Sequence, residues 1–327
     1  MSNKYSFLAV STAICALALS SQTASALTTV FDDTFNNGST INQAPATPTA
    51  NSASYEYAAS QVGGTTSTTI APGDMNIEFN NTSSMFGEVM AQFTSSPLTL
   101  ATVGSTIDLT VTFVNTERVL TAGDAGSRLA IGLYNSGGVA PLQGQMNLNS
   151  GNSLALGGAK NWQGFLGQAT TAGTSEYIGV RNPQTANSSS VQDLLFNNAT
   201  ANVAFSSPVA SILASSAATT TIGTGTTNTF ELMITLTGAS SMAISNTLYA
   251  GAGTGGTVLY SLNGTTNGVI NNFDALAFGW RFSGTKTNAT GDIQEIKVTE
   301  TVPEPSSIML VAASFGLMLS LIRRRHS

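Results

Sequence analysis

Apolar and polar residues alternate with a period of two along several short segments of the chain. Two segments show this most clearly, and their apolar positions are Phe230, Leu232, Ile234 and Leu236 in one and Ile107, Leu109, Val111 and Phe113 in the other. Such alternation is typical of a β-strand with one buried and one wetter face. The pattern predicts strands over residues 106–114 and 229–237.

The same short-period pattern recurs through the rest of the chain. It predicts further strands at residues 30–35, 54–58, 75–79, 87–93, 128–134, 177–180, 242–249, 258–262, 275–282 and 293–299. Turns rich in Gly, Asn and Ser separate them, and the single helical pattern is a short one at residues 190–196. About a dozen short strands without intervening helices predict an all-β fold, an antiparallel β-sandwich or jelly roll.

The N-terminal segment has the layout of a secretory signal. Lys4 precedes an apolar run over residues 7–19, and Ala24 and Ala26 form a small-x-small cleavage site. This layout predicts a signal peptide over residues 1–26 that is removed on export. Cys15, the one cysteine of the sequence, lies in the apolar run, so we expect a mature chain without disulfide or thiolate chemistry.

The C-terminal segment combines prolines, an apolar run and a basic cluster. Val302, Pro303, Glu304 and Pro305 are followed by a mostly apolar run over residues 307–322 and then by Arg323, Arg324 and Arg325. The run is about long enough to enter a bilayer as a single hydrophobic helix, and the arginines would hold its end on the cytoplasmic side. The prolines keep the preceding segment extended and outside that helix.

This order of motif, apolar helix and arginines resembles the PEP-CTERM sorting signal. The resemblance covers residues 302–327 and leaves residues 27–301 as the body. It implies recognition by an exosortase, a membrane protease of Gram-negative bacteria, with transient anchoring in the inner membrane. It also implies delivery to the cell surface or to the extracellular polysaccharide matrix.

Charge is scarce and mostly negative. Charged residues make up 9% of the sequence, and the formal net charge is −6. An acidic chain without a basic patch in its body argues against nucleic acid as a partner. The one histidine is His326, beyond the arginine cluster, so the body has no histidine for general base catalysis, a Ser-His-Asp triad or zinc binding.

A second resemblance concerns the end of the body. Residues 273–281 and 292–298 resemble the closing strands of concanavalin A-like lectin and glucanase jelly rolls. The resemblance implies that the last of these strands pairs with the strand that opens the domain, at residues 30–35. The laminarinase-type members carry Glu-x-Asp-x-x-Glu on one strand, and this sequence has no such triplet.

Candidate binding residues are few. Trp162 has polar neighbours in Asn161 and Gln163, so it is a candidate exposed platform for carbohydrate, with a core position as the alternative. Trp280 alternates with apolar residues and is expected in the core. No cofactor is expected, although Asp32, Asp33 and Asp292 could hold a structural calcium ion, since calcium prefers oxygen ligands.

Three functions stay open from the sequence. The preferred one is a non-catalytic surface or matrix protein that contacts polysaccharide or neighbouring proteins. The second is a secreted glycoside hydrolase or polysaccharide lyase, which would need two carboxylates from different strands about 5–10 Å apart. The third is a passive coat component without a specific ligand.

Overall fold

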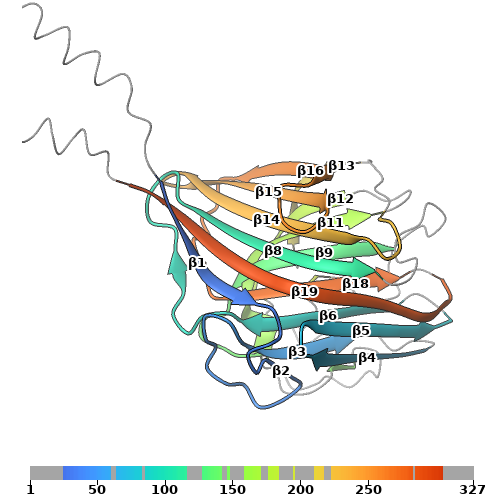
Figure 1. Ribbon diagram of the computed structural model, residues 1–327. Helices are drawn as coiled ribbons and strands as arrows, with labels where there is room; N and C mark the ends of the chain where they lie inside the picture. Colours follow the sequence, from blue (N-terminus) through green and yellow to red (C-terminus); the bar gives the residue numbers. More distant parts are fainter. Residues whose placement is uncertain are drawn as a thin grey trace, which may run out of the picture. The chain divides into compact units, whose positions relative to one another are not determined.

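The alternating segments form the strands of two stacked sheets in a computed structural model of the chain (Figure 1). The structure describes residues 25–59, 64–82, 85–115, 127–141, 146–147, 158–170, 176–183, 194–195, 210–216, 222–282 and 284–304. The chain divides into one unit of residues 28–300 and another of residues 1–27 and 301–327. The first unit is the body described below.

The first sheet of the described residues has eight strands. Along the sheet they are β16 (Thr257–Thr266), β15 (Ser241–Ala250), β14 (Thr227–Gly238), β8 (Thr106–Asn115), β19 (Lys286–Pro303), β5 (Asp74–Asn81) and β4 (Gly64–Ala71), with β1 (Ser25–Asp33) also paired to β19. The pairing of β1 with β19 confirms the expected contact between the opening and closing strands.

The second sheet of the described residues has nine strands. They are β10 (Met146–Asn147), β3 (Ser54–Ala59), β6 (Met85–Gln92), β18 (Ala275–Phe282), β9 (Arg128–Asn135), β11 (Gln163–Thr170), β12 (Glu176–Arg181) and β13 (Ala210–Ser216), with β2 (Thr40–Ile41) paired to β3. A 3-10 turn, η1 (Gly158–Asn161), precedes β11. The all-β two-sheet prediction is confirmed.

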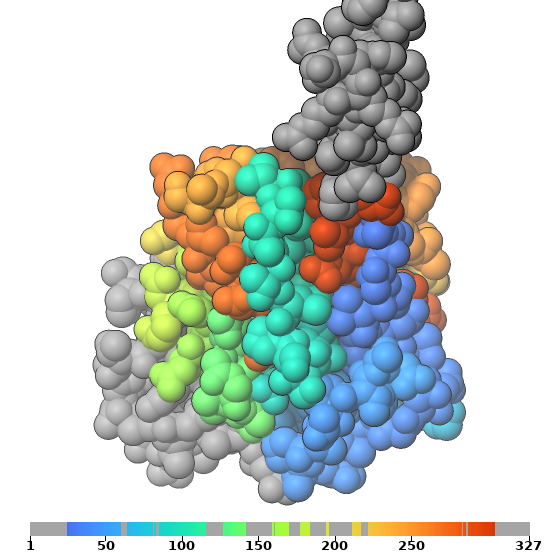
Figure 2. Space-filling model, turned by 90° about the vertical axis from the view of Figure 1, so that its left-hand side faces the viewer, coloured from blue at the N-terminus to red at the C-terminus, as the bar shows by residue number. Residues whose placement is uncertain are grey.

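A small third sheet closes one end of the sandwich. β7 (Leu98–Thr99) pairs with β17 (Asn272–Phe273), and the Leu100 amide donates to the Asn271 carbonyl at 2.8 Å. Figure 2 shows this end, where the segment near residue 100 lies beside the segment near residue 270.

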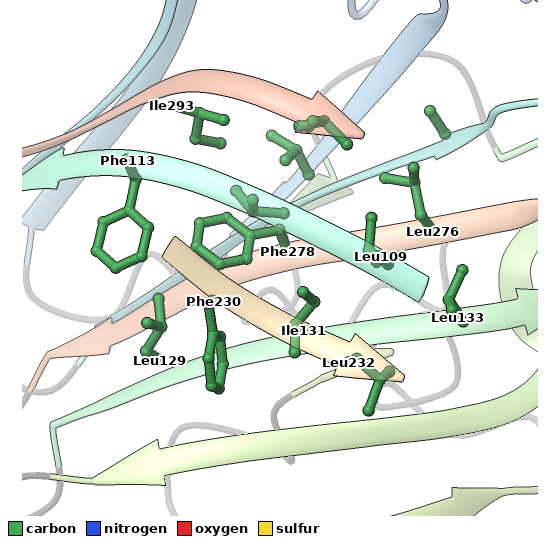
Figure 3. Close-up of a cluster of buried hydrophobic side chains, with 14 of the residues drawn as sticks. Leu109, Phe113, Leu129, Ile131, Leu133, Phe230, Leu232, Leu276, Phe278 and Ile293 are labelled. Carbon is green, nitrogen blue, oxygen red and sulfur yellow. The ribbon is translucent and has the colours of Figure 1, made fainter. Parts of the chain in front are cut away.

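The core fills the space between the two large sheets (Figure 3). The predicted apolar faces of β8 and β14 are fully or almost fully buried there. Phe278 and Trp280 of β18 stack edge-to-face, with ring centroids 4.7 Å apart, so the expected core position of Trp280 is confirmed. Gly291 makes room for this indole, because a Cβ at that position would lie 2.6 Å from Trp280 Cζ2.

Among the described residues, no helix is long and apolar enough to cross a membrane. The predicted signal peptide up to Ala24 and the predicted C-terminal helix, from Pro305 onward, lie outside the described residues. The hydrophobic tail therefore stays a prediction.

Candidate functional site

Trp162, the predicted carbohydrate platform, lies inside the body. Its side chain is fully buried between η1 and β11, and its Nε1 donates to the Val139 carbonyl oxygen at 2.8 Å. Arg181 donates to the Trp162 carbonyl oxygen. The expectation of an exposed indole is therefore wrong, although Asn161 is exposed and Gln163 is half-buried.

The three calcium candidates have separate partners. Asp33 is fully buried, and its carboxylate accepts from the Phe35 amide, Ser39 Oγ and Tyr55 Oη. Asp32 forms an ion pair with Lys297 at 2.7 Å, and Asp292 accepts from Asn76. Among the residues that the structure describes, no group of three or more acidic, histidine or cysteine side chains could hold a metal ion.

The predicted processing segments are only partly described. Ala26 is an exposed residue of β1, and Ala24 lies outside the described part. Val302 and Pro303 end β19, and Val302 and Glu304 are exposed. Pro305 and the arginine cluster Arg323, Arg324 and Arg325 lie outside the described residues.

The outer face of the nine-stranded sheet, away from the core, carries buried polar side chains. They are Glu56, Glu88, Arg128, Gln168 and Arg281, and each is at most 4% exposed. The strand registers explain this placement, because each alternates with residues that point into the sandwich. This face therefore lies under a second apolar layer rather than in contact with solvent.

Two covering residues, Leu194 and Leu195, are held to this face through their backbone. Glu88 accepts from both amides, Oε1 from Leu194 at 2.9 Å and Oε2 from Leu195 at 3.1 Å. Tyr134 Oη donates to the Leu194 carbonyl at 2.8 Å, and Gln168 Nε2 donates to the Leu195 carbonyl at 2.6 Å. All four backbone groups of this dipeptide are thus satisfied by side chains of the sheet, and both residues form a bend where the sequence predicted a helix.

The sheet leaves room for the Leu194–Leu195 dipeptide because two small residues lie between Glu88 and Gln168, the side chains that bind its backbone. In the register across four strands, Glu88 is opposite Gly279, Gly279 opposite Ala130, and Ala130 opposite Gln168. The middle of this row therefore has almost no side chain. A buried carboxylate that accepts two amide hydrogens is also well compensated for its desolvation.

Two arginines lie directly opposite each other beside this row. Arg128 pairs in register with Arg281, and Arg128 Nη1 donates to Gln168 Oε1 at 3.4 Å. Burial lowers the pKa of Arg128 to about 10, and the positive charge of Arg281 adds to this decrease. Like charges directly opposite each other in a sheet repel, in agreement with this direction of the pKa shift.

Glu56 and Glu88 are carboxylates from two different strands, as the hydrolase alternative would need. Glu56 is opposite Met90 and Glu88 is opposite Ala58, so the two carboxylates are diagonal neighbours on β3 and β6. The strand positions of diagonal neighbours in an antiparallel pair lie about 7–8 Å apart, within reach of long side chains. Both side chains are buried, however, and Glu88 is occupied by the backbone of Leu194 and Leu195.

A second carboxyl pair lies on the outer face of the eight-stranded sheet. Asp108 of β8 is opposite Met233, and Glu231 of β14 is opposite Thr110, so the carboxyls are again diagonal neighbours. Burial raises the pKa of Asp108 to about 8, and the charge of Glu231 and a hydrogen bond to it add to the increase. Tyr249 Oη donates to Glu231 Oε2 at 2.9 Å. Burial also raises the pKa of Glu231, whereas its hydrogen bonds with Tyr249 and Asp108 lower it.

An open groove adjoins this pair on the same sheet face. It has a volume of about 310 Å³ and is lined mainly by Met233, Thr235, Ala243, Ser245, Asn263 and Thr265 of three neighbouring strands, with Leu213 of β13 beside them. Asp108 is opposite Met233 in the register, so the carboxyl pair borders the groove. None of the described residues that line it carries a charge.

The sequence alone predicted neither the Glu88 anchor of the Leu194–Leu195 segment nor the Asp108–Glu231 pair. Glu88 stands alone among apolar residues of β6, and such an isolated carboxylate is a signal of a buried anchor. Asp108 and Glu231 occupy ordinary polar positions of alternating strands. Their proximity depends on a register between segments more than a hundred residues apart, which the sequence alone does not reveal.

We expect Glu88→Gln to release the Leu194–Leu195 segment. Glutamine leaves one of the two amides without an acceptor, at a cost of about 1–3 kcal/mol in the free energy of unfolding. Urea unfolding and amide exchange at Leu194 and Leu195 measure the two effects. Tyr134→Phe, which removes one hydrogen bond, should cost about 0.5–1.5 kcal/mol. Unchanged exchange in Glu88→Gln would contradict the anchoring role.

We expect stability to fall with rising pH because of Asp108. Between about pH 4 and about pH 8, the folded protein binds more protons at this carboxyl than the unfolded chain, so the free energy of unfolding decreases as pH rises. Asp108→Asn cannot titrate, so its stability should decrease less steeply across this range. Thermal unfolding midpoints from pH 4 to pH 9 test this, and parallel curves for the two proteins would rule it out.

No protein-family model matches the chain, and a search of curated proteins finds no match. Among solved structures, an endo-1,3-β-glucanase from Streptomyces sioyaensis is 11% identical with a TM-score of 0.41, covering 84% of this chain and 96% of that one. Lectin II from Ulex europaeus is 13% identical with a TM-score of 0.36, covering 86% and 99%. The exoplasmic/lumenal domain of VIP36 in a Ca²⁺/Man2-bound form is 12% identical with a TM-score of 0.39, covering 77% and 83%. At these identities and TM-scores, the likenesses carry no inference about the chemistry of this chain.

Proposed function

We propose that this chain is an exported, non-catalytic protein of the cell surface or extracellular matrix that binds carbohydrate in the groove of the eight-stranded sheet. An exosortase would recognise its C-terminal segment and release it from the inner membrane. The groove is the observation that carries the binding part of this proposal. The sorting part rests on the order of proline motif, apolar run and arginines in the sequence.

The lining of the groove suits a neutral, hydroxyl-rich ligand. Hydroxyl groups of Thr235, Ser245 and Thr265 and the amide of Asn263 can exchange hydrogen bonds with sugar hydroxyls. Met233 provides apolar surface for the C–H face of a sugar ring. A volume of about 310 Å³ is at the small end of ligand pockets, which fits one or two sugar units better than a long chain.

A glycoside hydrolase is the second candidate, and one observation favours it. Burial raises the pKa of Asp108 to about 8, and a carboxyl group that stays protonated near neutral pH beside a second carboxyl group is what general acid catalysis requires. Against it, this pair borders the groove rather than lining it. Hydrolysis of a glycan that is lost in both Asp108→Asn and Glu231→Gln would replace the binding proposal with this one.

We expect the protein to retain selected polysaccharides in a pull-down and glycan-array screen, and Asn263→Ala to weaken this binding. Loss of one hydrogen bond costs about 0.5–1.5 kcal/mol, which corresponds to a roughly 2- to 10-fold weaker affinity. Asn161→Ala, beside the buried Trp162, is the matched control and should bind normally. Absence of glycan binding would favour a passive coat component instead.

We expect the exported protein to lack the residues beyond Pro305 in its native host. Cleavage near the proline motif would remove the apolar run and the arginines. Mass spectrometry of the extracellular fraction measures the C-terminus directly. Recovery of exported chains that end in Arg325, His326 and Ser327 would contradict processing, whatever the glycan screen gives.

A further inference from the structure

Two edge strands lie on the same side of the sandwich. β16 ends the eight-stranded sheet and β13 ends the nine-stranded sheet, and Figure 1 shows them together as outermost strands. They stack across the sandwich, because a Cβ on Gly264 would lie 3.3 Å from the Cβ atoms of Leu213 and Ala214. β13 therefore packs against β16 at the inward-facing position of Gly264, and its Leu213 also reaches the groove residues Asn263 and Thr265. Among the described strands, none pairs with the outer edge of β16, and the backbone amide and carbonyl groups of an edge strand are complementary to another strand.

The usual protections of an edge strand are mostly absent from β16. Natural edges carry lysine or other charges, prolines or inward-pointing charged side chains that prevent pairing. β16 reads T-V-L-Y-S-L-N-G-T-T and has no charge and no proline. A register shift opposite Leu248 and Tyr249 makes a bulge in its first part, and the remainder from Tyr260 to Thr266 pairs regularly with β15.

Charge is missing from the surrounding sequence as well. Glu231 is the one charged residue between Asp193 and Asp274, a stretch that includes β13, β14, β15 and β16. The acidic body would otherwise resist association of two copies. This side is therefore where copies of the chain repel each other least.

β16 also exposes large apolar side chains beside its bulge. Val258 is 53% exposed and Leu259 is 37% exposed. The opposite edge of the same sheet, β4, is also uncharged but reads G-T-T-S-T-T-I-A, and its Ile70 is packed against the core. Apolar surface for an interface is thus present at β16 and not at β4.

We propose that β16 pairs antiparallel with β16 of a second copy, so that the two eight-stranded sheets become one continuous sheet across a two-fold axis. Such an isologous contact is self-complementary and closes as a dimer. The stacked β13 strands of the two copies would approach each other beside it. The proposal does not depend on glycan binding.

Sedimentation velocity of the full chain in a nonionic detergent, at increasing protein concentration, tests this association. The wild type should shift from monomer to dimer, and Val258→Lys should weaken dimerisation at least tenfold, because each copy would then bring a lysine charge into the interface in place of an apolar side chain. Val103→Lys replaces an equally exposed valine (55%) away from the edge and should dimerise as the wild type does. Dimerisation of Val258→Lys as strong as that of the wild type would overturn the proposal. Association of equal strength in every variant, as expected if the apolar run at residues 307–322 causes it, would also overturn it.

Hydrogen exchange provides a second measurement that does not depend on the fold of a variant. Backbone amides in residues 257–266 of the wild type should become more protected as the protein concentration rises. Exchange that is independent of concentration would overturn the proposal. Open-ended polymers in place of a dimer would also overturn it, because they require a heterologous pairing such as β16 with β4.

Discussion

The fold depends on the burial of one face of each large sheet against the other. Every central strand contributes alternate apolar side chains to this single layer, from Leu109 and Phe113 on one sheet to Phe278 and Trp280 on the other. A shift of one residue in any strand would move its whole apolar set to the wrong face, so the burial also fixes the register. The diagonal placement of Asp108 beside Glu231 and of Glu56 beside Glu88 follows from that register.

The sequence predicts strands well where the two faces of a strand differ. β8 and β14 alternate clearly, and both were predicted with their core faces. β11 was missed because both of its faces are buried, with Phe165 in the main core and Leu166 in the second layer, and because glycines interrupt its pattern. β4 was missed for the opposite reason, since threonine occupies inward and outward positions alike.

The candidate sites were less predictable than the fold because they are built by distant partners. Polar neighbours of Trp162 suggested exposure, but a carbonyl group at Val139 satisfies its indole N–H and allows full burial. Likewise, Glu88 serves two amides more than a hundred residues away. The local sequence shows which hydrogen bonds a side chain can make, whereas the tertiary packing decides which distant group is its partner.

The small number of charged residues in this chain affects both the structure of its sheet surface and the functions proposed for it. On the outer face of the eight-stranded sheet, hydroxyl pairs such as Thr106 with Thr235 and Thr112 with Thr229 occupy cross-strand positions where many soluble proteins place ion pairs. Salt screens interactions between exposed charges but has little effect on neutral hydrogen bonds and apolar contacts. A groove and an edge built from uncharged groups should therefore keep their affinities when ionic strength changes. That property suits a protein outside the cell, where the salt concentration is not regulated.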